Sequence, residues 1–156
     1  MRKLIPAVLA LCVVLTSAPG FAAEASPWLG TWTLYIAGSK LVGNSLLQLT
    51  MDILAADAAK FQYTLDGKLA DGRKVRQSYD GKPDGTPHPV LIEGKQVGQA
   101  SYKWISSRVI QGEASDPNGV KVTLTLELAK DGKSFTETRH VKTAQREYDE
   151  TMVFRK

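Results

Sequence analysis

The sequence predicts an all-β domain in which an antiparallel up-and-down meander of about eight to ten strands closes into a barrel. The first observation is an alternation of apolar and polar residues, clearest over residues 120–128. Alternation at period two gives a strand with one buried and one solvated face, whereas the same residues on a helix would surround its axis. The second is a series of short turn signals between such runs, and the third is the lack of a long amphipathic helical pattern.

The strands of the first half follow from three apolar stripes and the turns between them. Expected strands lie near residues 30–36, 45–55, 60–68, 73–79 and 89–94. The stripes consist of Trp32, Leu34 and Ile36, then Leu47, Leu49, Met51 and Ile53, then Phe61, Tyr63 and Leu65. Residues 55–60 contain helix-forming residues but are too few for more than a connection or a single turn. Turns are expected at Asp66-Gly67, Asp71-Gly72, Asp80-Gly81 and Asp84-Gly85, dipeptides that accept positive φ.

The strands of the second half are expected near residues 99–106, 108–114, 120–129, 134–142 and 146–155. Asn118-Gly119 precedes the most regular of them, and Asp131-Gly132 predicts a hairpin to the strand that contains Phe135. A long meander has two exposed edges, and closure into a barrel removes both. Consecutive short hairpins without long crossovers favour the barrel over a β-sandwich, which is the alternative.

The N-terminus has the order of a cleaved secretory signal peptide. Arg2 and Lys3 precede an apolar run over residues 4–15, and small residues follow, so cleavage is expected after Ala22 or Ala25. The run is too short for a membrane-spanning helix, which needs about 20 residues. We therefore expect a signal peptide over 1–22, a single domain over 23–156, no stable membrane span after cleavage, and a location in the periplasm or outside the cell.

Cysteine and charge exclude several classes of protein. The one cysteine, Cys12, lies in the apolar run, so the expected domain folds without a disulfide. The chain has 20 basic and 16 acidic residues, and loss of Arg2 and Lys3 leaves 18 basic ones. The densest basic cluster, residues 73–76, is offset by neighbouring aspartates, so we expect no nucleic-acid partner.

The first expected strand carries a family resemblance. Gly30-Thr31-Trp32 resembles the Gly-x-Trp of the lipocalin and fatty-acid-binding superfamily, the calycins, and the resemblance implies that Trp32 plugs one barrel end beneath Arg155 of the last strand. Lys156 would take the place of Arg155 if the last strand were shifted by one residue, since that shift exchanges the two faces. The chain also resembles small exported bacterial lipocalin-like barrels of unassigned function, through Ser39-Lys40, Tyr79-Asp80-Gly81-Lys82, His88-Pro89-Val90 and Asp131-Gly132-Lys133. Residues 37–45 are too few for the two-helix lid of eukaryotic fatty-acid-binding proteins.

No constellation of residues indicates catalysis. His88 and His140 could act as acid–base groups near neutral pH, but neither has partners nearby in the sequence, so a surface or packed role is expected. Two distant histidines without cysteines do not form a zinc site, and residues 80–85 lack the ligand pattern of a calcium loop. We expect a non-enzymatic protein with no metal or cofactor.

The leading hypothesis is a binding or carrier barrel for a small hydrophobic or amphipathic ligand in the cell envelope. Glu137 and Arg139 share a strand face with Phe135, and if that face points inward the pair could orient a polar ligand end; burial statistics favour instead a twisted strand with both charges in solvent. The alternative function is a protein-interaction or inhibitor module that uses barrel-mouth loops, notably residues 80–89. The other candidate lumen residues are Leu34, Leu49, Met51, Phe61, Tyr63, Tyr102, Trp104, Leu124 and Leu126.

Overall fold

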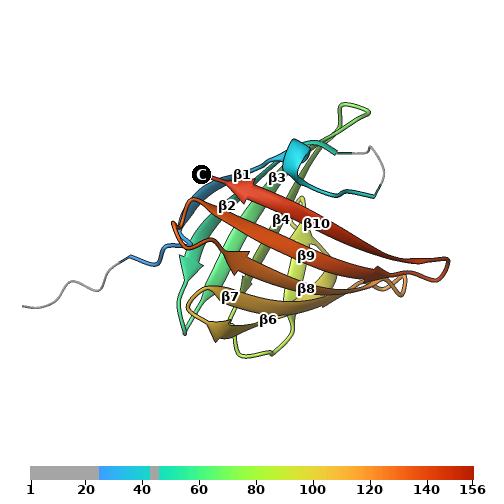
Figure 1. Cartoon of the computed structure of the whole chain (residues 1–156). Coiled ribbons are helices and arrows are strands. Elements are labelled where there is room, and N and C mark those ends of the chain that lie inside the picture. Colours follow the sequence, from blue (N-terminus) through green and yellow to red (C-terminus); the bar gives the residue numbers. More distant parts are fainter. Residues whose placement is uncertain (1–24, 43–45) are drawn as a thin grey trace, which may run out of the picture.

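The computed structural model describes residues 25–42 and 46–156 and shows a ten-stranded antiparallel barrel (Figure 1). The strands, in chain order, are β1 Gly30–Leu34, β2 Leu46–Ala56, β3 Phe61–Leu69, β4 Lys74–Gly81, β5 His88–Ile92, β6 Lys95–Ser106, β7 Val109–Ser115, β8 Lys121–Leu128, β9 Ser134–Lys142 and β10 Glu147–Arg155. The predicted signal peptide lies outside the described residues. No helix in the described ranges has both the length and the apolar character needed to cross a membrane.

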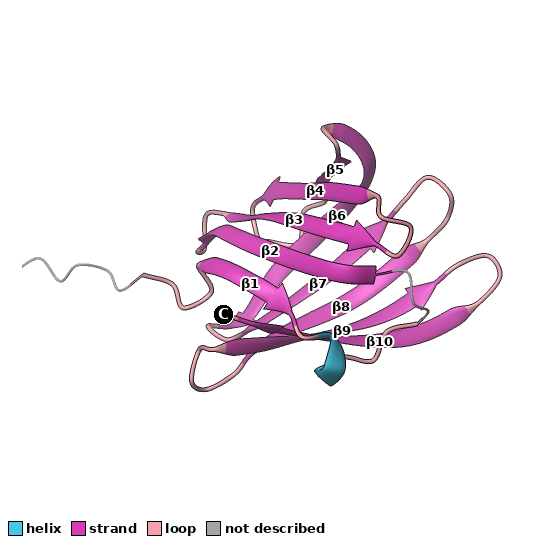
Figure 2. Cartoon of the chain, turned by 90° about the horizontal axis from the view of Figure 1, so that it is seen from above, coloured by secondary structure: helices cyan, strands magenta, loops and turns pink. Residues whose placement is uncertain are grey.

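Every strand pairs with the next strand in the sequence, and β10 returns to pair with β1. This order confirms the predicted up-and-down barrel and excludes the β-sandwich. Figure 2 shows the strands around the barrel seen from above. Because successive strands run in opposite directions, their connections lie alternately at the two ends of the barrel.

The strand boundaries agree with the predicted ranges to within a few residues, with two instructive differences. The first strand ends at Leu34 because residues 36–38 form a short 3₁₀ helix, η1 (Ile36–Gly38). The sixth strand begins at Lys95 because Glu93 and Gly94, with φ of 48° and 77°, form a two-residue hairpin turn directly after β5. Positive φ at both positions matches the twist of the flanking strands.

Closure between the first and last strands is brief. Only Thr33↔Arg155 and Leu34↔Phe154 pair between β1 and β10. Residues 35–42, which we call the closure strap, continue the contact along β10. The Tyr35 N–H donates to the Val153 carbonyl at 2.7 Å, and Lys40 forms an isolated antiparallel β-bridge with Thr151. The strap, including η1, thereby covers the part of β10 that β1 is too short to reach (Figure 1).

A group of fully buried aromatic rings closes one end of the barrel, which we call the floor. The Trp32 indole N–H donates to the Trp28 carbonyl at 2.8 Å, and the Trp28 indole N–H donates to the Ser107 carbonyl at 3.0 Å. The ring centre of Phe135 lies 5.0 Å from that of Trp32 and 4.7 Å from that of Phe154, on which Phe135 stacks. Gly30, at φ 116°, begins the strand that places Trp32 in this floor.

The predicted contact between Arg155 and Trp32 is wrong. The Lys156 ammonium lies 4.5 Å from the Trp32 ring centre, and the Arg155 guanidinium lies 3.6 Å from the ring centre of Tyr35. The cause is strand parity: Phe154 points into the core, so Arg155 points outward and Lys156 returns to the inner side.

Candidate functional site

The two ends of the barrel differ in how they are closed. Trp28 binds the β6–β7 connection, so the floor lies at the end that also holds the connections at 57–60, 82–87 and 129–133. The opposite end, the mouth, holds the turns at 70–73, 93–94, 116–120 and 143–146. The interaction hypothesis required the loop within residues 80–89 to lie at the mouth, but this loop lies at the floor end of the barrel. The loop is attached to the barrel wall through its backbone. The Gly85 N–H donates to the Tyr102 carbonyl at 2.9 Å, and Asp84 forms an isolated antiparallel β-bridge with Lys103.

A cavity of about 210 Å³ lies inside the barrel toward the mouth. Its walls are mostly aliphatic and aromatic, with a few polar groups that converge on the interior, the usual composition of a ligand pocket. The residues that line it are Met51, Tyr63, Leu65, Gln77, Val90, Val97, Gly98, Gln99, Ala100, Tyr102, Ala114, Ser115, Asp116, Val120, Val122, Leu124, Leu126, Glu137 and Arg139.

A second cavity, of about 290 Å³, lies beside the first and shares Leu65, Gln77 and Arg139 with it. Its remaining walls come from β2, β3, β4, β10 and the closure strap, and include Leu49 and Glu150. The Glu150 carboxylate accepts the Val42 N–H at 3.0 Å, which ties the end of the strap to the wall of this cavity. The three shared residues thus separate two parts of one barrel interior.

Glu137 and Arg139 form an ion pair inside the barrel. The Glu137 side chain is 3% exposed and that of Arg139 is 27% exposed, so the expectation that both reach solvent is wrong. The reason is that β9 keeps an unbroken register with β8 and β10, and its alternation therefore places Phe135, Glu137, Arg139 and Val141 on the inner face. Burial alone would lower the pKa of Arg139, but the charge and hydrogen bond of Glu137 outweigh it and raise that pKa.

Tyr63 and Tyr102 lie near this ion pair, and Tyr79 packs behind them. The hydroxyls of Tyr63 and Tyr102 are hydrogen-bonded at 2.8 Å, and Tyr79 stacks on Tyr63 with ring centres 5.5 Å apart. Burial raises the pKa of Tyr63 to about 12 and also raises the pKa of Tyr102, so both are neutral at physiological pH. The Tyr79 hydroxyl is buried and has no hydrogen-bond partner among the described residues.

The structure brings together most, but not all, of the residues predicted to line the lumen. Seven of them line the first cavity: Met51, Tyr63, Tyr102, Leu124, Leu126, Glu137 and Arg139. Leu49 lines the second cavity, whereas Leu34, Phe61 and Trp104 line neither. Phe61 and Trp104 extend the floor, where Trp104 packs against Trp28 with ring centres 6.0 Å apart.

Sequence reasoning missed Gln77, Gln99 and Ala100 as lining residues. Gln77 shares the inner face of β4 with Tyr79, which pairs with Tyr63 across the sheet. The strand pattern near residues 73–79 is weakly alternating, so the sequence did not indicate which face of β4 points inward. Gln99 and Ala100 fall near the start of a strand whose first four residues were predicted as a connection.

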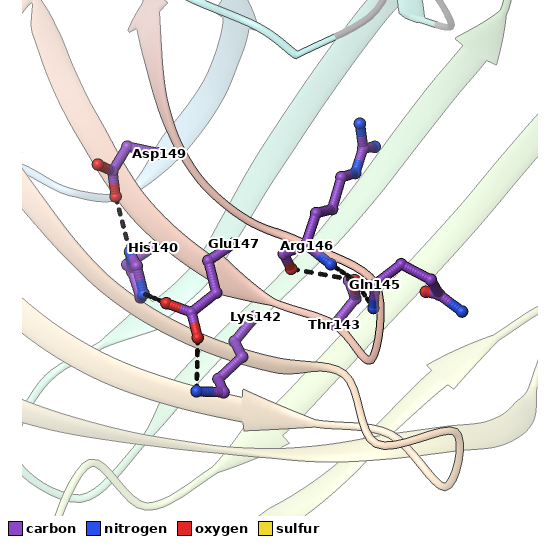
Figure 3. Close-up of polar contacts among 7 residues, drawn as sticks. All are labelled: His140, Lys142, Thr143, Gln145, Arg146, Glu147 and Asp149. Atoms are coloured by element: carbon purple, nitrogen blue, oxygen red, sulfur yellow. Dashed lines mark hydrogen bonds and ion pairs between the residues drawn. The ribbon is translucent and has the colours of Figure 1, made fainter.

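Neither histidine contributes to the cavities. His140 lies on the outer wall, where its Nδ1 is 2.8 Å from Asp149 Oδ1 and its Nε2 is 3.7 Å from Glu147 Oε2 (Figure 3). The Glu147 carboxylate also pairs with Lys142, so the cluster is a network of exposed charges on the β9–β10 hairpin. His88 packs edge-on against Tyr79, and its Nε2 accepts the Lys82 N–H at 3.3 Å. Across residues 25–42 and 46–156, no group of three or more potential metal ligands is found.

Comparison with known proteins shows the fold. No protein-family model matches the chain, and no curated protein sequence matches it. A Schistosoma mansoni fatty acid binding protein, solved in complex with arachidonic acid, is 14% identical, with a TM-score of 0.55 over 84% of this chain and 96% of that chain. A redesigned β-barrel is 12% identical, with a TM-score of 0.50 over 84% of this chain and 92% of that chain. The chain therefore has the ten-stranded barrel fold of the fatty-acid-binding proteins.

Proposed function

We propose that this protein is a non-enzymatic binding or carrier barrel for a small hydrophobic or amphipathic ligand, exported to the cell envelope by a cleaved signal peptide. The observation that carries the proposal is the cavity toward the mouth, which has aliphatic walls and a buried polar cluster on one side. Barrels of this size enclose enough space for one small ligand.

The dimensions and the chemistry of the cavity limit the ligand. With a volume of about 210 Å³, the first cavity accommodates a short chain or a single ring system. Leu124 and Leu126 would contact the apolar part, while the Glu137–Arg139 pair and the tyrosine hydroxyls would contact a polar end. Among the described residues, both histidines lie outside the two cavities.

The proposal is tested by native mass spectrometry of the protein purified from its own host, followed by displacement of an uncharged fluorescent probe by a panel of hydrophobic metabolites. We expect a co-purified small molecule or a saturable, stoichiometric displacement. Absence of both across the panel would refute the carrier function.

A cavity-filling variant localises the binding. Ala114→Trp places an indole in the cavity near the mouth and should abolish probe binding, since Ala114 is one of its lining residues. Ala144→Trp adds the same side chain to the exposed β9–β10 turn and serves as the matched control. Equal binding by the two variants would show that the probe binds elsewhere.

A further inference from the structure

More negative than positive side chains line the barrel interior. Arg139 is the one basic residue among the described residues that line the two cavities, whereas Glu137, Asp116 and Glu150 are all carboxylates. The Val120 N–H donates to Asp116 at 2.9 Å and holds the pKa of that carboxyl below its usual value. Negative formal charges therefore outnumber positive ones on the walls of the two cavities.

From this arrangement we infer that the barrel selects uncharged ligands whose polar end is a hydrogen-bond donor, a hydroxyl or an amide, and rejects carboxylates of the same chain length. The inference rests on the proposed binding function and names the ligand class for that site. It separates two chemistries that the shape and the apolar walls of the cavity would accept equally.

The first argument is that Glu137 already compensates the charge of the guanidinium. Arg139 Nε donates to Glu137 Oε1, and the two side chains are neighbours on one strand face, so their pairing needs no rearrangement. The other guanidinium N–H groups could still receive an incoming carboxylate, but two negative charges would then share a single positive one. One of the two carboxylates would remain as a buried, uncompensated charge, which is strongly unfavourable in a low-dielectric interior.

The second argument is that the same groups can receive a neutral donor. A carboxylate has about four lone-pair sites, and the hydrogen bond described for Glu137 uses one of them. A ligand hydroxyl or amide N–H can donate to a remaining site without breaking the ion pair. The hydroxyls of Tyr63 and Tyr102 and the amide of Gln77, which also line the cavity, can bind the oxygen of the same head group.

The test compares octan-1-ol, octanamide and octanoate at pH 8, where octanoate is ionised, by displacement of the uncharged probe. The two neutral ligands should bind wild-type protein about tenfold more tightly than octanoate, or better. Glu137→Gln removes the competing carboxylate and leaves Arg139 free, so octanoate affinity should rise by about tenfold or more. Glu127→Gln is the matched control, because Glu127 lies on the adjacent strand β8 but is exposed on its outer face, and it should change neither affinity.

The outcomes separate this inference from the proposed function. Octanoate binding as tightly as octan-1-ol, or more tightly, would overturn the inference and leave the carrier function intact. Failure of all three ligands and of the probe to bind would overturn both. If Glu137→Gln does not fold by circular dichroism, the Glu137→Gln/Arg139→Gln variant replaces it. This variant lacks both the carboxylate and the guanidinium, so its octanoate affinity should not rise relative to its octan-1-ol affinity, and such a rise would overturn the inference.

Discussion

Replacing Trp32 by Ala tests the role of the floor. The indole is fully buried, and loss of a buried Trp costs about 3–5 kcal/mol of stability. The substitution also removes the 2.8 Å hydrogen bond to the Trp28 carbonyl, which adds about 1 kcal/mol. The expected loss of about 4–6 kcal/mol is a large share of the roughly 5–15 kcal/mol that stabilises a small domain.

Urea unfolding followed by far-ultraviolet circular dichroism measures this loss without relying on the fluorescence of the mutated residue. With a slope of about 2 kcal/mol per molar urea, the midpoint should fall by roughly 2–3 M. A loss below about 2 kcal/mol would refute the conclusion that Trp32 is the central ring of the floor.

A double-mutant cycle then identifies the cation that lies over Trp32. Lys156→Ala combined with Trp32→Leu should show a coupling of about 0.5 kcal/mol or more, because the ammonium lies 4.5 Å from the ring centre. Arg155→Ala combined with Trp32→Leu should be additive, since the Arg155 guanidinium contacts Tyr35 instead. Coupling with Arg155 and none with Lys156 would contradict the observed strand parity.

Three further predictions concern the polar cluster and its supports. Arg139→Ala leaves Glu137 buried without its partner and should cost about 2–4 kcal/mol in urea unfolding, reduced from the value for a fully buried pair by the 27% exposure of Arg139; a change within 0.5 kcal/mol, the size of an ordinary surface substitution, would contradict it. Since burial raises the folded-state pKa of Tyr63 from 10.0 to about 12, its stabilising effect is complete below pH 10 and is lost as the pH rises toward 12, so the urea midpoint should fall over that range and tyrosinate absorbance at pH 11 should increase on unfolding. Gly112→Ala would place a Cβ 2.8 Å from the Tyr102 ring and should cost about 1–3 kcal/mol while breaking the Tyr63–Tyr102 hydrogen bond; an unchanged melting temperature would show that Tyr102 moves freely.

The sequence was sufficient for the strand order because alternation and turn dipeptides are local signals. Asp131-Gly132, for example, predicted a hairpin, and the chain turns there with Gly132 at φ 66°. The turns predicted at Asp66-Gly67 and Asp80-Gly81 are wrong, because these dipeptides lie within β3 and β4. The turn at Glu93-Gly94 was missed because Glu adopts positive φ only rarely; its carboxylate accepts the Arg76 N–H at 2.8 Å, a contact that depends on the neighbouring strand.

The interior was less accessible to sequence reasoning because inward and outward faces depend on exact register. Alternation through Met152 and Phe154 already indicated that Arg155 faces outward, yet the resemblance to calycins led to the opposite expectation. The burial of Glu137 followed from strand parity but conflicted with the general preference of carboxylates for solvent. Trp28 gave no signal of its own, because it precedes the first strand and only the closed barrel shows that it covers the floor.

The short pairing between β1 and β10 has a consequence for how the chain folds. The two strands come from opposite ends of the sequence, so the contacts that complete the cylinder close the longest loop in the molecule. Hairpins between consecutive strands can form locally, but β1 gains its second neighbour only when β10 pairs with it. Such topologies have high contact order and fold slowly, because the entropy of loop closure is lost before the distant contacts form. Completion of the barrel is therefore a late step of folding, and until then the free edges of β1 and β10 remain open to pairing with other chains.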